Sequence, residues 1–545
     1  MKKYTTVLVS LMVSAVALFT PSCVNDLDVS PIDPDINSPD KVLNSIEAFQ
    51  QLLAKCYGSL AVSASEGPDS SPDISGIDGG FGQYMRALFN VCTLPTDEAS
   101  CTWNDQTIRS LHGLSWTTSD VFVTAMFSRI YYQIGLCNEF IRQAHAAPAD
   151  LQGEEMDYMI AQARALRALS YYHAIDLFGN VPFATEEDPI SATEGPDQVS
   201  RYQLYEWLVD EIGGENGFRK DLRPAAGTEY GRCSQEFATM LLAKLYLNSQ
   251  IFTNCDDPKY GGEGRPAIAG EWDKCIEECR SIISSYPLDT PYPYLFSADN
   301  NQFNEIIFAV QSDADLIQSY GNTNFVIKSS IVSGNSEWQA ALGVNDGWGG
   351  LVVTAQLIDL FAGNEETDAR YIFTDGSEFG DSHIKNVLDQ SDFTNGYCQM
   401  KFTNLNHDGT NISSTAGYPN TDYPIFRASD AYLMLAEAQL RRGSIDAEGL
   451  EAFNAVRERA GLEPLSTVTL DDIIDERGRE FYWENMRRQD LIRFGLFTTD
   501  DYVWEWKGGM YDGQGVDDHF NLFPIPTTEI NTSNKLEQNP GYGGM

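Results

Sequence analysis

Residues 161–183 read AQARALRALSYYHAIDLFGNVPF, and their apolar side chains recur at the spacing of an amphipathic helix. The pattern begins near Glu154 and continues to Phe178. Gly179 follows directly, and a glycine is typical just after a helix C-terminus. This stretch predicts one long helix, and the segments around it decide the fold class.

Helical periodicity recurs on both sides of this stretch. Many of the periodic segments begin after a helix-capping residue or end near a glycine, such as Gly443 or Gly495. No strict repeat consensus joins them, so we expect irregular tetratricopeptide-like helix pairs rather than a regular solenoid. The chain is therefore predicted to be mainly α-helical. The other predicted helices cover residues 42–57, 121–145, 202–212, 235–250, 271–284, 430–441, 447–460 and 470–493.

Two regions, residues about 63–115 and 286–423, have a different composition, because long parts of them are rich in Gly, Ser, Asn and Asp. Loops on a rigid scaffold often carry the residues that bind a ligand. We therefore expect the functional site in these two regions. No long linker divides the chain, and residues 42–545 are interpreted as a single domain.

The N-terminus predicts a bacterial lipoprotein signal peptide over residues 1–22. Two lysines precede an apolar run that is too short to span a bilayer, and the sequence TPSC follows at 20–23. Cys23 is expected to be acylated, with residues 23–41 as a flexible tether to the membrane. The Thr and Pro of TPSC are unusual beside a lipoprotein cleavage site, so an ordinary cleaved signal peptide is the alternative.

The charge balance is strongly acidic, with 36 Lys and Arg against 79 Asp and Glu and a formal net charge of -43. Binding to nucleic acid requires a basic surface that neutralises phosphates, so nucleic acid and anionic lipid headgroups are poor partners. Neutral sugars remain compatible with such a surface. Solubility alone is the favoured reason for the charge.

The sequence offers little that would support catalysis. It has no nucleophile elbow, phosphate-binding loop or dinucleotide fingerprint, and its six histidines show no metalloprotease spacing. A glycosidase needs two carboxylates across the scissile bond, and Asp97-Glu98 is the most obvious pair. A local cap or turn is the favoured interpretation of that pair, so the chain is predicted not to be an enzyme.

One segment resembles a calcium-binding loop. Asn404, Asn406, Asp408 and Gly409 follow the start of an EF-hand pattern, but Thr415 stands where the bidentate Glu should be. An Asx-rich turn is therefore favoured over a calcium site. We predict no metal and no cofactor.

The ten cysteines form no C-x-x-C pair. Cys275 and Cys279 lie one helical turn apart. This spacing favours two thiols on one helix face over a disulfide.

Aromatic residues within Gly- and Asn-rich loops point to sugar binding. These residues are Trp103, Tyr320, Trp338 and Trp348. A pyranose ring has an apolar face that stacks on an indole or phenol ring, while its hydroxyls need donors and acceptors at the rim. Packing that anchors the loops is the alternative for each of these rings.

Four ordered segments resemble the SusD/RagB family of Bacteroidetes outer-membrane lipoproteins, and the resemblance covers essentially the whole chain. Besides residues 161–183, they read FRASDAYLMLAEAQLRRG at 426–443, DERGREFYWENMRRQDLIRFG at 475–495, and LFPIPTTEI at 522–530 followed by QNPGY at 538–542. These signatures are interpreted as structural: Glu, Arg and Asp on helix faces can pair across packed helices.

The resemblance implies a fold and a function. The fold is one SusD-like domain with four tetratricopeptide-like helix pairs and a loop-rich ligand-binding insertion. The function is capture of oligosaccharides at the cell surface by a lipid-anchored outer-membrane protein. The protein would then deliver them to a SusC-like TonB-dependent barrel, without catalysis.

Within the family, three segments resemble the founding starch-binding member: LPTDEASCTWND at 94–105, SYGNTNF at 319–325 and NDGWGGL at 345–351. Starch or malto-oligosaccharides are therefore the favoured ligand. Fructan, another plant or host glycan, and peptide remain alternatives, and a surface glycosidase is less favoured. The resemblance implies an aromatic arc of Trp103, Tyr320 and Trp348 with polar contacts from Arg86 and from Asn104 or Gln106; Trp338 has no counterpart but stays a candidate.

Overall fold

The computed structural model describes residues 42–64, 66–189, 195–254, 267–411 and 417–543. The predicted signal peptide, Cys23 and the tether lie outside the described residues. Across the described part of the chain, no helix combines the length and apolar character needed to cross a membrane.

The protein is mainly helical, as predicted, and its few strands are short. The helices are α3 (Ile46–Ala61), α4 (Tyr84–Cys92), α5 (Gln106–His112), α6 (Val121–His145), α7 (Glu154–Leu177), α8 (Arg201–Gly213), α9 (Gln235–Leu247), α10 (Ser249–Phe252), α11 (Trp272–Ile283), α12 (Asn322–Ser329), α13 (Ser336–Ala341), α14 (Ala355–Asp359), α15 (Ala428–Arg442), α16 (Ala447–Arg459), α17 (Leu470–Phe481), α18 (Arg487–Arg493) and α19 (Thr527–Thr532). The strands are β1 (Ala99–Cys101), β2 (Val181–Pro182), β3 (Gln198–Val199), β4 (Ile306–Val310), β5 (Leu351–Val353), β6 (Phe373–Thr374), β7 (Cys398–Gln399) and β8 (Tyr423–Arg427).

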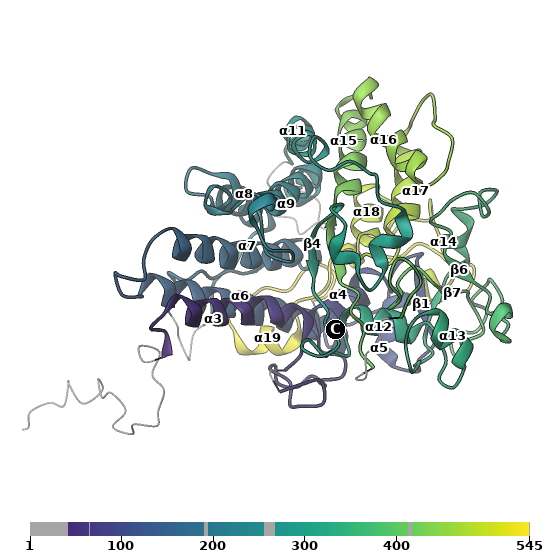
Figure 1. The fold of residues 1–545 in the computed structure, drawn as a ribbon, viewed down its shortest axis with the longest axis horizontal. Helices are drawn as coiled ribbons and strands as arrows, with labels where there is room; N and C mark the ends of the chain where they lie inside the picture. Colours follow the sequence, from purple (N-terminus) through teal and green to yellow (C-terminus); the bar gives the residue numbers. More distant parts are fainter. Residues whose placement is uncertain (1–41, 65, 190–194, 255–266, 412–416, 544–545) are drawn as a thin grey trace, which may run out of the picture.

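The long helices form the scaffold. In Figure 1, α3, α6 and α7 lie along one another, α8 and α9 lie above them, and α15, α16 and α17 stand on the opposite side of the molecule. Helix α7 is buried around most of its circumference, as a helix at the centre of a large core must be. The sequence at 161–183 is thus the centre of the packing.

One predicted helix is two helices in the structure. The expected helix 470–493 ends at Phe481 as α17 and resumes at Arg487 as α18, because Trp483 and Asn485 adopt left-handed φ angles of 62° and 65°. The backbone N–H of Trp483 donates to a carboxylate oxygen of Glu98 at 3.1 Å, and its indole N–H donates to the Glu98 carbonyl at 3.1 Å. These long-range hydrogen bonds stabilise the break between α17 and α18.

The family signatures meet in space. The side-chain amide of Asn539 donates to the carbonyls of Phe178 and Phe523, each at 2.7 Å. Gly179 has a left-handed φ of 71°, and a Cβ there would lie 2.9 Å from Leu522. The C-terminal segments are therefore docked on the end of α7.

Charged residues of the signatures pair across the packed helices, as expected. Arg477 of α17 bonds Asp430 of α15 and Asp490 of α18, both at 2.8 Å. Arg493 of α18 bonds the same Asp490 at 2.7 Å and Glu437 of α15 at 2.9 Å. The signature acids and bases thus join three helices.

A second buried network surrounds Arg427, at the junction of β8 and α15. Its guanidinium bonds Glu305 at 2.9 Å, Glu480 at 2.9 Å and Glu484 at 2.7 Å, and all four side chains are essentially unexposed. Burial alone would raise the pKa of Glu480, but Arg459 and Arg427 hold that pKa well below its usual value. Arg427 therefore contacts three buried carboxylates, and Arg459 and Lys401 supply further positive charge to the same network.

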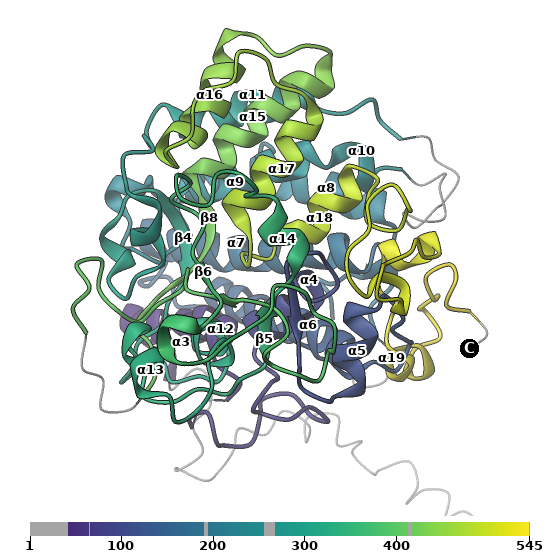
Figure 2. The ribbon, with the colours of Figure 1, turned by 90° about the vertical axis from the view of Figure 1, so that its right-hand side faces the viewer.

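The two loop-rich regions come together through a small antiparallel sheet. Strand β1 pairs with β5, with Ala99 opposite Val353 and Cys101 opposite Leu351. Figure 2 shows β5 between α5 and α12, below the upright group of α15, α16 and α17. Residues 63–115 and 286–423 therefore share one end of the molecule.

Candidate functional site

The β1–β5 pairing places Trp103 beside the segment that carries Trp348. Just beyond β1, the N–H of Thr102 donates to the Gly350 carbonyl at 2.8 Å. The indole N–H of Trp103 then donates to the Gly349 carbonyl at 2.6 Å. These bonds fix the Trp103 ring against the loop from the other region.

Helix α12 positions the other two predicted rings. Tyr320 lies just before α12, and the N–H of Trp348 donates to the carbonyl of Lys328 in its last turn at 2.7 Å. The Tyr320 and Trp348 rings meet edge to face, with centroids 6.0 Å apart and planes at 67°. Three rings from two distant parts of the chain thus gather in one place.

Arg86 of α4 lies beside the Trp103 ring and the backbone of Tyr320. Its guanidinium donates to the Gly80 carbonyl at 2.7 Å and to the Tyr320 carbonyl at 3.2 Å. It also sits 4.3 Å from the centre of the Phe325 ring and 5.6 Å from that of Trp103. Burial lowers the pKa of Arg86 to about 10, so it remains a charged donor near neutral pH.

Two neighbours of Tyr320 were missed by the sequence analysis. The Tyr418 ring lies 6.0 Å from the Tyr320 ring, and the Tyr320 hydroxyl donates to Asp69 at 2.8 Å. Contacts with Tyr418 and then Asp69 raise the pKa of Tyr320. Tyr418 stands between a glycine and a proline in the loop-rich insertion, so the loop-aromatic criterion could have found it.

We call the cluster of Trp103, Tyr320, Trp348 and Tyr418 the aromatic site. Each of the four rings is half-buried, so each is anchored by neighbours while part of it stays accessible. This combination suits stacking against a sugar face, because the rings need no rearrangement before contact.

The polar candidates beside Trp103 are exposed. Asn104 and Gln106 both lie at the surface, and the Gln106 amide donates to Ser110 at 3.2 Å. Asn104 directly follows Trp103 in the chain. Both residues are thus at the surface close to Trp103 in the sequence.

Trp338 does not belong to this surface. Its side chain is completely buried on α13, stacked on Phe379 with centroids 5.2 Å apart and against the edge of His383 at 5.6 Å. The expectation that Trp338 contacts a ligand is therefore corrected: the ring packs beneath the loops.

The Asp97–Glu98 pair is also structural. Asp97 accepts hydrogen bonds from Arg487 at 2.7 Å and from the Tyr502 hydroxyl at 2.6 Å. Burial, and then the Asp97 charge, raises the pKa of Glu98 to about 8. Both side chains are buried and hold Arg487 and Trp483 in place. Neither carboxylate is available to a glycosidic bond.

The calcium-like segment forms a turn through its own side chains. Asp408 accepts from the Thr410 backbone at 2.9 Å and hydroxyl at 2.6 Å, and Asn406 donates to that hydroxyl at 3.0 Å. Thr415 lies outside the described residues. Among the residues that the structure describes, no group of three or more His, Cys, Asp or Glu is placed to hold a metal.

Cys275 and Cys279 lie on one face of α11 as expected. Their sulfur atoms are 4.0 Å apart, and both thiols are buried. The two residues are free thiols.

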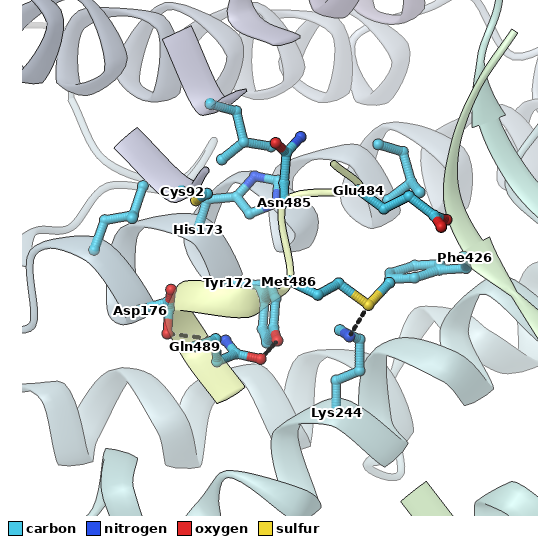
Figure 3. Close-up of a pocket in the computed structure, with 13 residues that line it drawn as sticks. Cys92, Tyr172, His173, Asp176, Lys244, Phe426, Glu484, Asn485, Met486 and Gln489 are labelled. Carbon is cyan, nitrogen blue, oxygen red and sulfur yellow. Dashed lines mark hydrogen bonds between the residues drawn. The ribbon is translucent and has the colours of Figure 1, made fainter. Parts of the chain in front are cut away.

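An internal cavity of about 50 Å³ lies among α4, α7, α9, β8 and the turn before α18 (Figure 3). Gln489 crosses one side, accepting from Tyr172 at 2.8 Å and donating to Asp176 at 2.9 Å. Ligand pockets for small molecules are usually about 300–1,000 Å³, whereas a single water needs only about 30 Å³. This cavity therefore suits water and not a sugar.

Gly350→Ala should weaken ligand binding at the aromatic site by about tenfold, or about 1.4 kcal/mol. A Cβ at this position would lie 2.5 Å from two atoms of the Trp103 indole, so the ring has to move. Calorimetric titration of the variant measures the loss. Gly58→Ala is the control, because a Cβ there meets nothing within 4 Å and should leave affinity unchanged. Equal affinity in both variants would contradict the role of Trp103.

Comparisons with known proteins identify similar sequences and a similar fold. Residues 304–542 match the SusD family. The chain is 32% identical to the starch-binding protein SusD of Bacteroides thetaiotaomicron over 96% of both chains, and 25% identical to a SusD-like protein of Bacteroides ovatus over 72% of this chain and 70% of that one. Its fold matches surface glycan-binding protein A of B. thetaiotaomicron in complex with laminarihexaose, with a TM-score of 0.67, 21% identity and coverage of 90% and 99%.

These matches support the expectations of a SusD-like fold and of a chain that is not an enzyme. The assignment of the chain to a family rests on sequence identity above 30% over nearly its whole length. The chain belongs to the SusD family.

Proposed function

We propose that the protein captures oligosaccharides at the aromatic site and delivers them to a SusC-like TonB-dependent transporter. The observation that carries the proposal is the assembly of Trp103, Tyr320 and Trp348 from two distant parts of the chain, with the charged donor Arg86 beside the Trp103 ring. Stacking faces with donors at their rim are the chemistry that recognises sugars. The relative that is 32% identical is named a starch-binding protein, which supports glycan capture.

The preferred ligand is an α-glucan such as a malto-oligosaccharide. The Tyr320 plane is inclined by 67° to Trp348 and by 43° to Tyr418. Rings at such angles form a curved surface, which suits a helical α-glucan better than a flat chain such as cellulose. The neighbour bound to laminarihexaose shares 21% identity, so a β-glucan belongs among the tested alternatives, with fructan and other plant or host glycans.

The proposed place of action is the outer face of the outer membrane. Acylation of Cys23 would anchor the chain there through lipid, with residues 23–41 as the tether. The body of the protein would then lie over the transporter and release glycan into it.

Isothermal titration of the chain from Val24 onward tests the binding function. The panel contains maltoheptaose, cyclodextrin, laminarihexaose, and oligosaccharides of levan, inulin, xylan and pectin. We expect binding to the α-glucans and recovery of the sugar uncut. Binding to another glycan alone would contradict the starch assignment but keep glycan capture. If none of these sugars binds, the result would contradict glycan capture and favour a peptide ligand.

A further inference from the structure

Lys328 of α12 differs from many of the buried cations that the structure describes. Acids outnumber bases by 79 to 36, and buried bases such as Arg370, Arg427 and Arg477 have carboxylate partners at 2.7–2.8 Å. Lys328 is only 7% exposed. Within the described residues, its ammonium makes neither a hydrogen bond nor an ion pair.

Another buried lysine, Lys507, has a hydrogen-bond acceptor for each of its three donors. Lys507 also lacks a carboxylate partner, but it donates to the carbonyls of Leu496 at 3.2 Å, Thr499 at 2.6 Å and Tyr502 at 2.7 Å. A lysine ammonium has three donors, and Lys507 uses all of them. The protein thus supplies three oxygen atoms to Lys507, whereas none of the described residues supplies one to the Lys328 ammonium, which stays open to solvent.

The position of Lys328 explains where its donors are directed. Its ammonium lies 5.8 Å from the ring centres of both Trp348 and Tyr418. Ring faces attract a cation but accept no strong hydrogen bond. Asp346 is the acid that acts on it electrostatically, but that carboxylate already accepts from Gly347 at 2.8 Å and Ser333 at 3.0 Å. The ammonium thus lies beside two rings of the aromatic site with its donors free for a ligand.

Arg86 is a second cation of the aromatic site and lies beside the Trp103 ring. Its buried Nε atom has no hydrogen-bond partner, and no acid forms an ion pair with it in the described part of the chain. A buried donor without an acceptor is costly to a fold. Arg86 lies beside Trp103, and Lys328 lies beside Trp348 and Tyr418. Two cations thus flank different rings of the aromatic site, where a bound ligand can supply oxygen atoms.

We propose that Lys328 is a specificity-determining residue, donating from Nζ to hydroxyl or ring oxygens of a neutral sugar that stacks on Trp348 and Tyr418. The inference rests on the proposed function and adds a residue and a ligand chemistry to it. Asp69 and Asp346 flank the cluster, and the net charge of -43 repels polyanions at long range. A neutral glycan therefore fits better than one rich in carboxylates or sulfates.

Lys328→Met tests this inference, because methionine keeps an unbranched apolar stem and removes the donors. We expect affinity for the best neutral oligosaccharide to fall by about tenfold or more, since hydrogen bonds from charged groups are strong. Lys328→Arg keeps charge and donors and should retain more affinity than the Met variant. Lys385→Met is the matched control, because Lys385 pairs with Asp359 at the surface and lies outside the aromatic site.

Titrations of the purified variants at low and high salt separate the outcomes. Sugar affinity that is unchanged in Lys328→Met would overturn the inference and leave the proposed function intact. Absence of neutral-sugar binding in the wild type would overturn both. Preference for uronate oligosaccharides with strong salt dependence would overturn the neutral-sugar assignment. If Lys328→Met does not fold, affinity in Lys328→Gln equal to that of the wild type would count against the inference.

Discussion

Trp348→Ala is expected to weaken oligosaccharide binding by about thirtyfold or more, equivalent to about 2 kcal/mol. The ring lies between Tyr320, 6.0 Å away, and the Lys328 ammonium, 5.8 Å away. Removing it therefore deletes a stacking surface and leaves Lys328 with one ring face in place of two. Calorimetric titration with the preferred oligosaccharide measures the change.

Trp207→Ala is the matched control for that experiment. Trp207 is also half-buried, but it belongs to α8 and packs on Tyr171 and Phe183 with centroids 5.3 and 4.8 Å away. Its loss should lower stability and leave the affinity of the folded protein unchanged. Wild-type affinity in Trp348→Ala, or equal losses in both variants, would argue against the aromatic site.

Arg427→Met is expected to lower the free energy of unfolding by about 3–5 kcal/mol. The substitution removes the cation that contacts all of Glu305, Glu480 and Glu484. Arg459 and Lys401 then remain as partners of three buried carboxylates, so one negative charge is left without a matching cation. An uncompensated buried charge costs far more than the loss of one surface contact. Chemical denaturation followed by fluorescence measures the change.

Arg442→Met gives the comparison. Arg442 pairs with Asp273 at 2.7 Å, but the two side chains are 40% and 80% exposed. Such a surface pair contributes about 0–1 kcal/mol, so its removal should be nearly neutral. A similar small change in Arg427→Met would show that the network around Arg427 does not stabilise the fold as argued.

Helices of the scaffold could be predicted because their apolar spacing is local. The helix expected at 121–145 is α6 with the same bounds, and that expected at 154–178 is α7 to within one residue. The break between α17 and α18 could not be predicted in this way. It depends on bonds from Trp483 to Glu98, which is 385 positions away in the chain.

The candidate site was predictable only in part. Trp103, Tyr320 and Trp348 stood out as aromatics in polar loops, and so did Trp338. Trp338 differs from the other three rings because it is buried against Phe379 and His383. The composition of the loops cannot reveal this burial.

Lys328 was missed for a related reason. It lies within a short helix and has no distinctive local motif. Lys328 becomes a candidate because its ammonium has no protein acceptor among the described residues once α12 has packed beside Trp348. That is a property of the tertiary structure.

The most direct test of the account is a crystal structure of the protein with maltoheptaose. The account predicts sugar rings stacked on Trp103, Tyr320 and Trp348, with Arg86 and Lys328 within hydrogen-bonding distance of sugar oxygens. A well-ordered sugar bound elsewhere on the molecule, with the four rings of the aromatic site left bare, would contradict it.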